Sequence, residues 1–259
     1  MGARYTVVGD NTIDRYLDGP VLVGGNALNV AVQLRLLGAP VSYFGAVGDD
    51  EDGRLIAGAL RARGVDADGL TTVPGVTAVT EIRLTALNDR VFEREEFGVT
   101  AAYRPTDAEL DRIAEHAWVH IGMLPNAPEF VQRLRSRPGR RTISQDCAVS
   151  AGFAGLDVAF CSAGEQEDQA QDLARRALAG GASLAVVTRG AAGALATDGE
   201  RTWRCAALPI DVVDTTGAGD AFIAGFAAAR SVGAPVDTAL DSGAQTAARA
   251  CTHLGGFPQ

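Results

Sequence analysis

Short apolar runs alternate with stretches of helical spacing along nearly the whole chain. In Asn26–Leu37 apolar residues recur every three or four positions, and Gly38 follows as a stop signal. Thr106-Asp107-Ala108-Glu109 is a capping box, which predicts a helix from there to His116. Further helices are expected at Asp52–Arg63, Glu129–Arg135, Glu167–Ala179, Asp220–Ser231 and Asp237–Thr252, and strands at Tyr5–Gly9, Val41–Val47, Trp118–Ile121, Thr142–Ser144, Val158–Cys161 and Leu184–Thr188. The alternation predicts a doubly wound, mostly parallel sheet that binds ligands beyond the carboxyl ends of its strands.

Two regions depart from this alternation. Gly193–Thr197 and Arg201–Ala206 have the pattern of a hairpin around Asp198-Gly199. Residues 71–99 alternate polar and apolar side chains around Asn88-Asp89, which indicates a β-hairpin with one solvated face, inserted between α/β units. Such a flap fits a lid over a substrate; the alternative is an edge extension of the main sheet.

Composition narrows the class of protein. The 259 residues are 47% hydrophobic, enough for one large α/β domain or two small ones. A net charge of −9 argues against a nucleic-acid duplex as partner. The chain has no apolar run of about 18 residues and no signal-peptide pattern, so we expect no membrane partner and a cytoplasmic location. The four cysteines lack C-x-x-C spacing and are expected to be small core residues in a reducing compartment.

All 23 basic residues are arginine, because the sequence contains no lysine. This excludes a Walker A loop, whose lysine contacts phosphates, and it excludes Schiff-base and pyridoxal phosphate chemistry. Any phosphate chemistry must therefore use backbone amides, arginine and metal.

The stretch Asp214–Phe222 carries the most information about chemistry. Leu208, Ile210, Val212 and Val213 predict a strand before it, and Ala221–Ala229 predicts a buried helix after it. The Gly-Ala-Gly turn between them presents unpaired amides to an anion, with Asp220 in the first helical turn. This arrangement suits phosphoryl transfer to a hydroxyl. An aspartate at that position is also often a mere partner of the helix dipole. Phe222 occupies the place of the third glycine of a dinucleotide fingerprint, which argues against an oxidoreductase.

This stretch resembles the C-terminal signature of the ribokinase (PfkB) family of sugar kinases. Three N-terminal segments extend the resemblance over essentially the whole chain: Gly9-Asp10-Asn11-x-x-Asp14, Gly24-Gly25-x-x-x-Asn29-x-Ala31 and Gly45-x-Val47-Gly48-x-Asp50-x-x-Gly53. The resemblance implies a single ribokinase-like α/β domain over residues 1–259, with a mostly parallel central sheet and a small β-strand lid from about residues 11–22 and 71–100.

The resemblance also implies roles for individual residues. Asp220 resembles the catalytic base, and the amides of Gly217, Ala218 and Gly219 resemble the anion hole. Asp14, Gly25, Asn26 and Asn29 match the sugar site, and Thr188, Gly190, Gly193, Thr216 and Gly219 match the site for ATP. Arg189 either approaches the phosphates or is simply solvated.

The metal-binding part departs from the family pattern. Where the family has Asn-x-x-Glu, which organises Mg²⁺ through water, this chain has Ser162 and Glu165, with Glu167 as a rival. Asp214 and Thr216 resemble ligands of a monovalent cation, K⁺, in some members. The further ligands expected from Ala250–Gly255 match loosely, so a K⁺ requirement stays an open alternative.

The segments Gly9-Asp10-Asn11 and Ala247–Phe257 are similar to the fructoselysine 6-kinase subgroup, which phosphorylates the 6-hydroxyl of Amadori sugars. A carboxylate would then meet the substrate ammonium, and the candidates are Glu81, Glu93, Glu95, Glu96 and Asp146. The Glu93–Glu96 cluster is favoured as a solvated lid tip. Alternatives are a family kinase for another sugar or nucleoside, or a non-catalytic sensor on the same fold. The resemblance also implies a homodimer formed through the lid.

Overall fold

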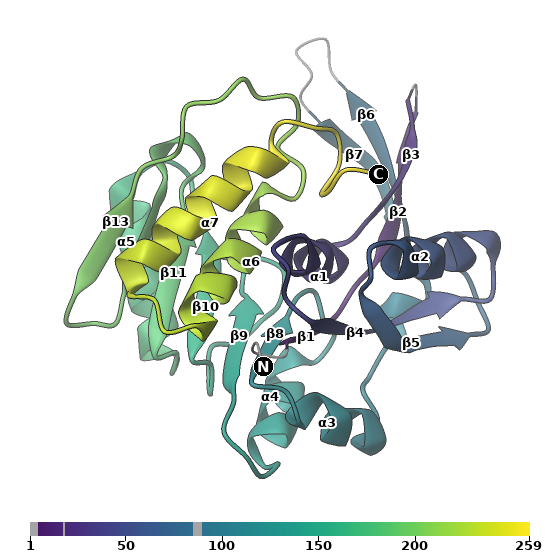
Figure 1. The fold of residues 1–259 in the computed structure, drawn as a ribbon, viewed down its shortest axis with the longest axis horizontal. Coiled ribbons are helices and arrows are strands. Elements are labelled where there is room, and N and C mark those ends of the chain that lie inside the picture. The colour runs from purple at the N-terminus through teal and green to yellow at the C-terminus, as the bar shows by residue number, and fades with distance from the viewer. Residues whose placement is uncertain (1–4, 18, 85–89) are drawn as a thin grey trace.

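A nine-stranded sheet forms the centre of the molecule (Figure 1). The computed structural model describes residues 5–17, 19–84 and 90–259. The strand order is β13-β12-β11-β10-β9-β8-β1-β4-β5, and the pairs from β11 to β5 are parallel, while β12 and β13 run antiparallel at one edge. The strands are β1 Tyr5–Val8, β4 Val41–Gly48, β5 Asp66–Val73, β8 Trp118–Ile121, β9 Thr142–Asp146, β10 Val158–Ser162, β11 Leu184–Thr188, β12 Ala194–Thr197 and β13 Thr202–Cys205.

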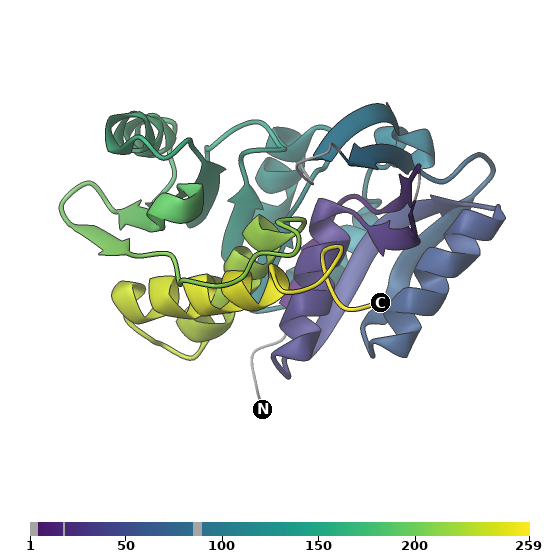
Figure 2. The ribbon, with the colours of Figure 1, turned by 90° about the horizontal axis from the view of Figure 1, so that it is seen from above.

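Helices cover both faces of this sheet, as Figure 2 shows from above. A hydrophobic core lies on each face of the sheet, and successive residues of a strand pack in different cores. Val7 and Val186 pack in the first core, and Val8 and Val187 pack in the second. The first core contains α1 (Asn26–Leu36), α2 (Glu51–Ala62), α6 (Ala218–Ser231) and α7 (Val236–Ala250); the second contains α3 (Asp107–Ala114), α4 (Ala127–Arg135) and α5 (Glu167–Ala179). The predicted doubly wound fold is therefore confirmed.

A second, smaller sheet stands beside the main one, at the top of Figure 1. Its order is β3-β2-β6-β7, built from β2 (Thr12–Tyr16), β3 (Val21–Gly24), β6 (Val79–Leu84) and β7 (Arg90–Glu96). Tyr16, Leu22 and Ile82 form a small core of its own. Strands β2, β6 and β7 fall within the two segments expected for a lid, and β3 begins in the first segment and extends past it to Gly24. The turn expected at Asn88-Asp89 lies outside the described residues.

The structure corrects several expectations about elements. Residues 71–73, expected in the lid hairpin, belong to β5, whose Asp66–Val73 had not been predicted as a strand. The 3-10 helix η1 (Gly98–Ala102) takes up the end of that range, and η2 (Gly190–Ala192) follows β11. The strand expected from Leu208 to Val213 is wrong: the segment is irregular, and Leu208, Val212 and Val213 are exposed. Its apolar side chains border a cavity and do not pair into the sheet.

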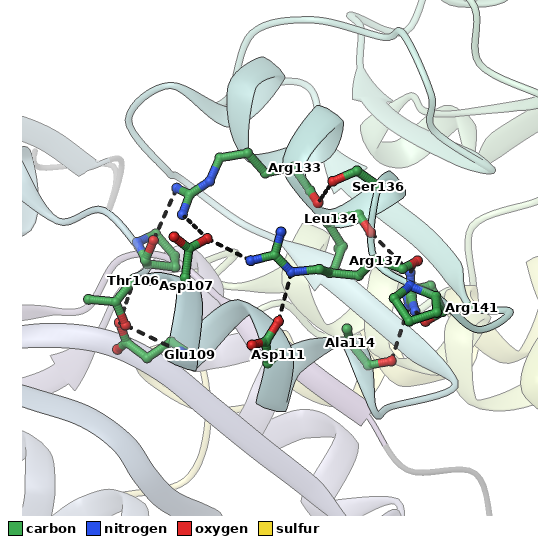
Figure 3. Close-up of polar contacts among 12 residues, drawn as sticks. Thr106, Asp107, Glu109, Asp111, Ala114, Arg133, Leu134, Ser136, Arg137 and Arg141 are labelled. Carbon is green, nitrogen blue, oxygen red and sulfur yellow. Dashed lines mark hydrogen bonds and ion pairs between the residues drawn. The ribbon is translucent and has the colours of Figure 1, made fainter.

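A network of arginines and aspartates links α3 with α4 and the residues that follow α4 (Figure 3). Arg137 contacts both Asp107 and Asp111, and Arg133 contacts Asp107 and the carbonyl of Pro105. The predicted capping box of α3 is confirmed, since Thr106 accepts the amide of Glu109 and Glu109 accepts that of Thr106. No helix in the described part of the chain combines the length and apolar character needed to cross a bilayer.

Candidate active site

Helix α6 begins at a glycine turn that only glycine fits. Gly217 has φ +69°, and a Cβ on it would lie 2.5 Å from the Cα of Gly256. Gly256 in turn lies against Asn29, so that the C-terminal tail, the start of α6 and helix α1 meet at one place. Of the three amides expected to form an anion hole, that of Ala218 donates to the Thr215 carbonyl at 3.2 Å.

Two asparagines from the first turn of α1 hold the carboxylate of Asp220. Asn26 Nδ2 donates to Asp220 Oδ1 at 2.6 Å, and Asn29 Nδ2 donates to Oδ2 at 2.8 Å. The i, i+3 spacing puts both amides on one face of the helix, although they lie about 190 positions from their partner (|i−j| 194 and 191). The structure thus brings together three of the predicted site residues, one from the catalytic set and two from the sugar set.

Burial strongly affects the charge of Asp220, whose exposed fraction is 8%. Desolvation raises its pKa well above the ordinary value, and the negative charges of Asp146 and Asp10 raise it further. The hydrogen bonds from Asn29 and Asn26 oppose this rise by stabilising the anion. The result is a carboxylate that binds a proton readily, as a general base requires.

Asp10 and Asp146 had not been assigned to the catalytic group by sequence reasoning. Asp10, after β1, accepts the amides of Asn26, Ala27 and Met123 at 2.8, 3.0 and 3.2 Å, so it fixes the start of α1. Asp146 ends β9 and accepts from Asn26 Nδ2 at 2.8 Å. Both lie at the carboxyl ends of strands, where a sheet of this kind binds its ligands. This position is the sequence signal that could have assigned them to the site.

Asp14 and Gly25 occupy the border between the small sheet and α1. Asp14 lies on β2 and is buried, and a Cβ on Gly24 would approach its Oδ2 to 2.5 Å. Gly25 has φ +110°, and a Cβ there would lie 2.5 Å from the Cα of Asn11. This close turn brings β3 directly into α1 and thereby sets the position of Asn26.

A cavity of about 690 Å³ adjoins the start of α6. Thr188, Gly190, Gly193 and Gly219, four of the residues expected at a nucleotide site, line it together with Ala218. Thr215 lines it as well, whereas Thr216 is buried against Asp214. Sequence reasoning missed the apolar wall, made by Leu208, Pro209, Ile210 and Val212 with Ala244, Ala247 and Ala248 of α7. Small and aliphatic side chains of this kind can cover a flat aromatic base.

Comparison with known proteins agrees with this geometry. A family model described as "pfkB family carbohydrate kinase" matches residues 18–130 and 149–257. The chain belongs to this family. It is therefore a sugar kinase.

Among known proteins, this kinase is 35% identical over 258 residues to the fructoselysine 6-kinase of Escherichia coli, covering 96% of the chain and 98% of the relative. The fructosamine kinase FrlD of Bacillus subtilis is 32% identical, with coverage of 98% and 93%. Among solved structures, Arabidopsis thaliana ribokinase complexed with ribose and ATP superposes with a TM-score of 0.89 at 22% identity, over 100% of this chain and 96% of that one. These findings confirm the predicted family and sugar-kinase class.

The two candidate metal-binding glutamates of the kinase differ in their surroundings. Glu167 binds Arg204 at 2.7 Å and lies 3.6 Å from Arg189. Glu165 is exposed in the loop between β10 and α5, which follows Ser162 at the rim of the cavity. The arginines lower the pKa of Glu167 and compete with a metal for its oxygens.

Asp214 is a centre of hydrogen bonds in the kinase. It accepts from the amide and hydroxyl of Thr216 at 2.9 and 2.6 Å, from the amide of Gly255 at 2.9 Å, and from the hydroxyl of Tyr16 at 3.4 Å. Protein donors therefore already contact both oxygens that a monovalent cation would use. The carboxylate links the loop before α6 with the C-terminal tail and the small sheet.

Proposed function

We propose that this kinase transfers the γ-phosphoryl group of ATP to the 6-hydroxyl of fructoselysine or a related Amadori sugar. The observation that carries the proposal is the buried carboxylate of Asp220, held by Asn26 and Asn29 at the start of α6 and next to a cavity of nucleotide size. The relatives at 32–35% identity, named for fructoselysine and fructosamine, support this substrate class.

In the proposed reaction Asp220 accepts the proton of the 6-hydroxyl as the oxygen attacks the γ-phosphorus. One P–O bond forms to the sugar, the bond to ADP breaks, and the proton remains on the aspartate until solvent removes it. Asn26 and Asn29 orient the carboxylate, and the amides at Gly217 and Gly219 stabilise charge on the transferring group, whereas the amide of Ala218 already donates to the Thr215 carbonyl. Asp14 and Gly25 complete the sugar side from the direction of the small sheet, which acts as the lid.

Magnesium would be held on the Ser162 side of the cavity, with Glu165 as its carboxylate through water. When bound, the ion neutralises charge on the phosphates. Carboxylate oxygens suit Mg²⁺, and the exposed Glu165 fits this better than the arginine-bound Glu167. A potassium requirement is not part of the proposal, because protein donors occupy both oxygens of Asp214. We assign the reaction to the cytoplasm, where ATP is supplied and the four free cysteines remain reduced.

We also infer a homodimer formed through the small sheet. Leu17 and Val21, at the ends of β2 and β3, are 53% and 51% exposed and would be covered in such a pair. Light scattering of the wild type and of Leu17→Asp tests this, because the variant should be monomeric if the contact exists.

The experiment for the function is a coupled ADP-release assay with ATP and a panel of fructoselysine, fructose, ribose and nucleosides. We expect the highest kcat/KM with fructoselysine, and phosphorus NMR should place the phosphate on O6. A sensor would bind sugar without releasing ADP, and that result would contradict the proposal.

We expect kcat/KM to fall on the acid side at a pH well above the value for an ordinary carboxyl. Asp220 must be ionised to accept a proton, and its surroundings raise its pKa, so protonation inactivates the free enzyme earlier as the pH falls. The measurement is a pH–rate profile at saturating ATP, with thermal unfolding at each pH as the control for stability. An acid limb near the ordinary carboxyl pKa would contradict the assignment.

Arg189 is expected to position the nucleotide-binding turn without touching the nucleotide. It is buried, its guanidinium donates to the Ala192 carbonyl at 2.8 Å, and its amide donates to the Gly193 carbonyl at 2.7 Å. The burial of Arg189 contradicts free solvation, while contact with the phosphates stays an untested alternative from the sequence. Arg189→Met should raise the KM for ATP by about 3- to 10-fold, the loss of one hydrogen bond, with the sugar KM unchanged.

Arg204→Met is the matched control for this test. Arg204 binds the same Glu167 but is exposed on β13 and makes no bond to the turn. It should leave both KM values as they are. Equal effects of the two variants would show that the ion pair, and not the turn, matters.

A further inference from the structure

Among the described residues, no ion pair with a cation balances the negative charge around Asp220. Asp10, Asp146 and Asp220 lie around Asn26, and the burial of each raises its pKa. The ion pairs found among the described residues all lie elsewhere. Asp10 is satisfied by three backbone amides, whereas Asp146 and Asp220 share the amide nitrogen of Asn26 and have one further donor each.

Two buried amide oxygens near these carboxylates also need hydrogen-bond donors. The nitrogens of Asn26 and Asn29 donate to carboxylates, which fixes the orientation of both amides. Their Oδ1 atoms are shielded from solvent and have no partner among the described residues, and Asn29 is only 4% exposed. A buried acceptor without a donor costs free energy, so these oxygens point to a ligand that donates hydrogen bonds.

Asp146 is well placed to receive a positive charge. Its Oδ2 accepts from Asn26 at 2.8 Å and its Oδ1 accepts the amide of Ala148 at 2.9 Å, which leaves lone pairs on both oxygens. Two of the lid glutamates are poorer candidates, because Glu93 contacts Arg83 and Glu96 contacts Arg94. Asp146 is also buried, and burial makes an ion pair stronger and more selective than at an exposed glutamate.

We propose that Asp146 determines the substrate specificity of this kinase by binding a protonated amine attached to C1 of the sugar, while Asp220 faces the 6-hydroxyl. This rests on the proposed kinase function of the same site. A single amide nitrogen contacts both carboxylates, so their two ligands must lie close together. In a fructofuranose, C2 and C5 lie on either side of the ring oxygen, and they carry the C1 amine arm and the C6 hydroxyl arm. The substrate class is therefore a 1-amino-1-deoxyketose.

The test compares 1-amino-1-deoxyfructose with fructose, which has a neutral hydroxyl in place of the amine. For the wild type we expect a higher kcat/KM with the amino sugar. Asp146→Asn keeps the shape and the contact with Asn26 but removes the charge. It should lower kcat/KM for the amino sugar about 10- to 100-fold more than kcat/KM for fructose, mainly through KM.

Glu95→Gln, at an exposed position on the lid strand β7, is the control, and calorimetric ATP binding verifies the fold of each variant. Loss of amine preference in Glu95→Gln and not in Asp146→Asn would overturn the proposal, as would an equal fall for both sugars. If Asp146→Asn does not fold, a wild type without preference for the amino sugar still contradicts it. Turnover of neither sugar by the wild type would instead refute the proposed kinase function itself.

Discussion

Asp220→Asn should lower kcat by about 10²- to 10⁴-fold, the typical contribution of a general base. Asparagine has nearly the same shape, and its amide oxygen can still accept from Asn26 or Asn29, but it cannot take the proton of the attacking hydroxyl. ATP binding should persist, because the cavity walls are unchanged. The coupled ADP-release assay measures kcat, and calorimetry measures the dissociation constant for ATP.

Asp237→Asn is the matched control, since Asp237 also lies in the first turn of a helix but is exposed. If Asp220 acted only on the helix dipole, both variants would have similarly small effects. Activity of Asp220→Asn within about threefold of the wild type would refute the base assignment.

Asp220→Asn should not destabilise the protein at neutral pH. A carboxyl whose pKa is raised by folding favours the folded state while protonated, and that contribution is lost as the pH rises through the folded pKa. Asparagine has no carboxyl to ionise, so the variant does not lose this stability as the pH rises. Its melting temperature at pH 7 should therefore equal or exceed that of the wild type. The difference should shrink below the ordinary carboxyl pKa, near 3.8. A large drop in melting temperature at pH 7 would indicate that ionised Asp220 stabilises the fold.

Locally encoded elements could be predicted from the sequence almost to the residue. Helix Glu167–Ala179 and strand Leu184–Thr188 have the predicted bounds, because periodic burial and a glycine stop define them without distant partners. The Gly-Ala-Gly turn at Gly217–Gly219 could be predicted for the same reason, because the positive φ of Gly217 and the start of a helix require particular residue types.

Features that depend on distant contacts or ligands could not be predicted. The run Leu208–Val213 has the composition of a strand, yet its apolar side chains border a cavity. Periodicity does not distinguish apolar residues that line a cavity from apolar residues that pack in a sheet. Asp66–Val73 is too polar to indicate a strand by itself and is ordered by pairing with β4. The contact of Asn26 with Asp146 spans 120 positions, so the sequence offered Asp146 only as one of five candidate carboxylates and did not indicate that it shares Asn26 with Asp220.

Gly217→Ala should strongly destabilise the protein at the active site. Alanine pays about 1–2 kcal/mol to adopt the left-handed φ of +69°, and its Cβ would lie 2.5 Å from the backbone of Gly256. With the repacking that this clash forces, we expect a loss of about 2–4 kcal/mol in the free energy of unfolding. Displacing Gly256 also disturbs Asn29 and hence Asp220, so kcat should fall as well.

Gly219→Ala should behave in the opposite way, although it lies two residues away. Its Cβ would meet nothing within 4 Å, and alanine in a helix is favoured over glycine by up to about 1 kcal/mol, so stability should hold or rise. Because Gly219 lines the cavity, the added methyl group should still hinder the phosphates and raise the KM for ATP. Thermal unfolding and ATP kinetics of both variants separate the two roles. Equal losses of stability would contradict the different packing of these glycines, and an unchanged KM in Gly219→Ala would remove Gly219 from the nucleotide site.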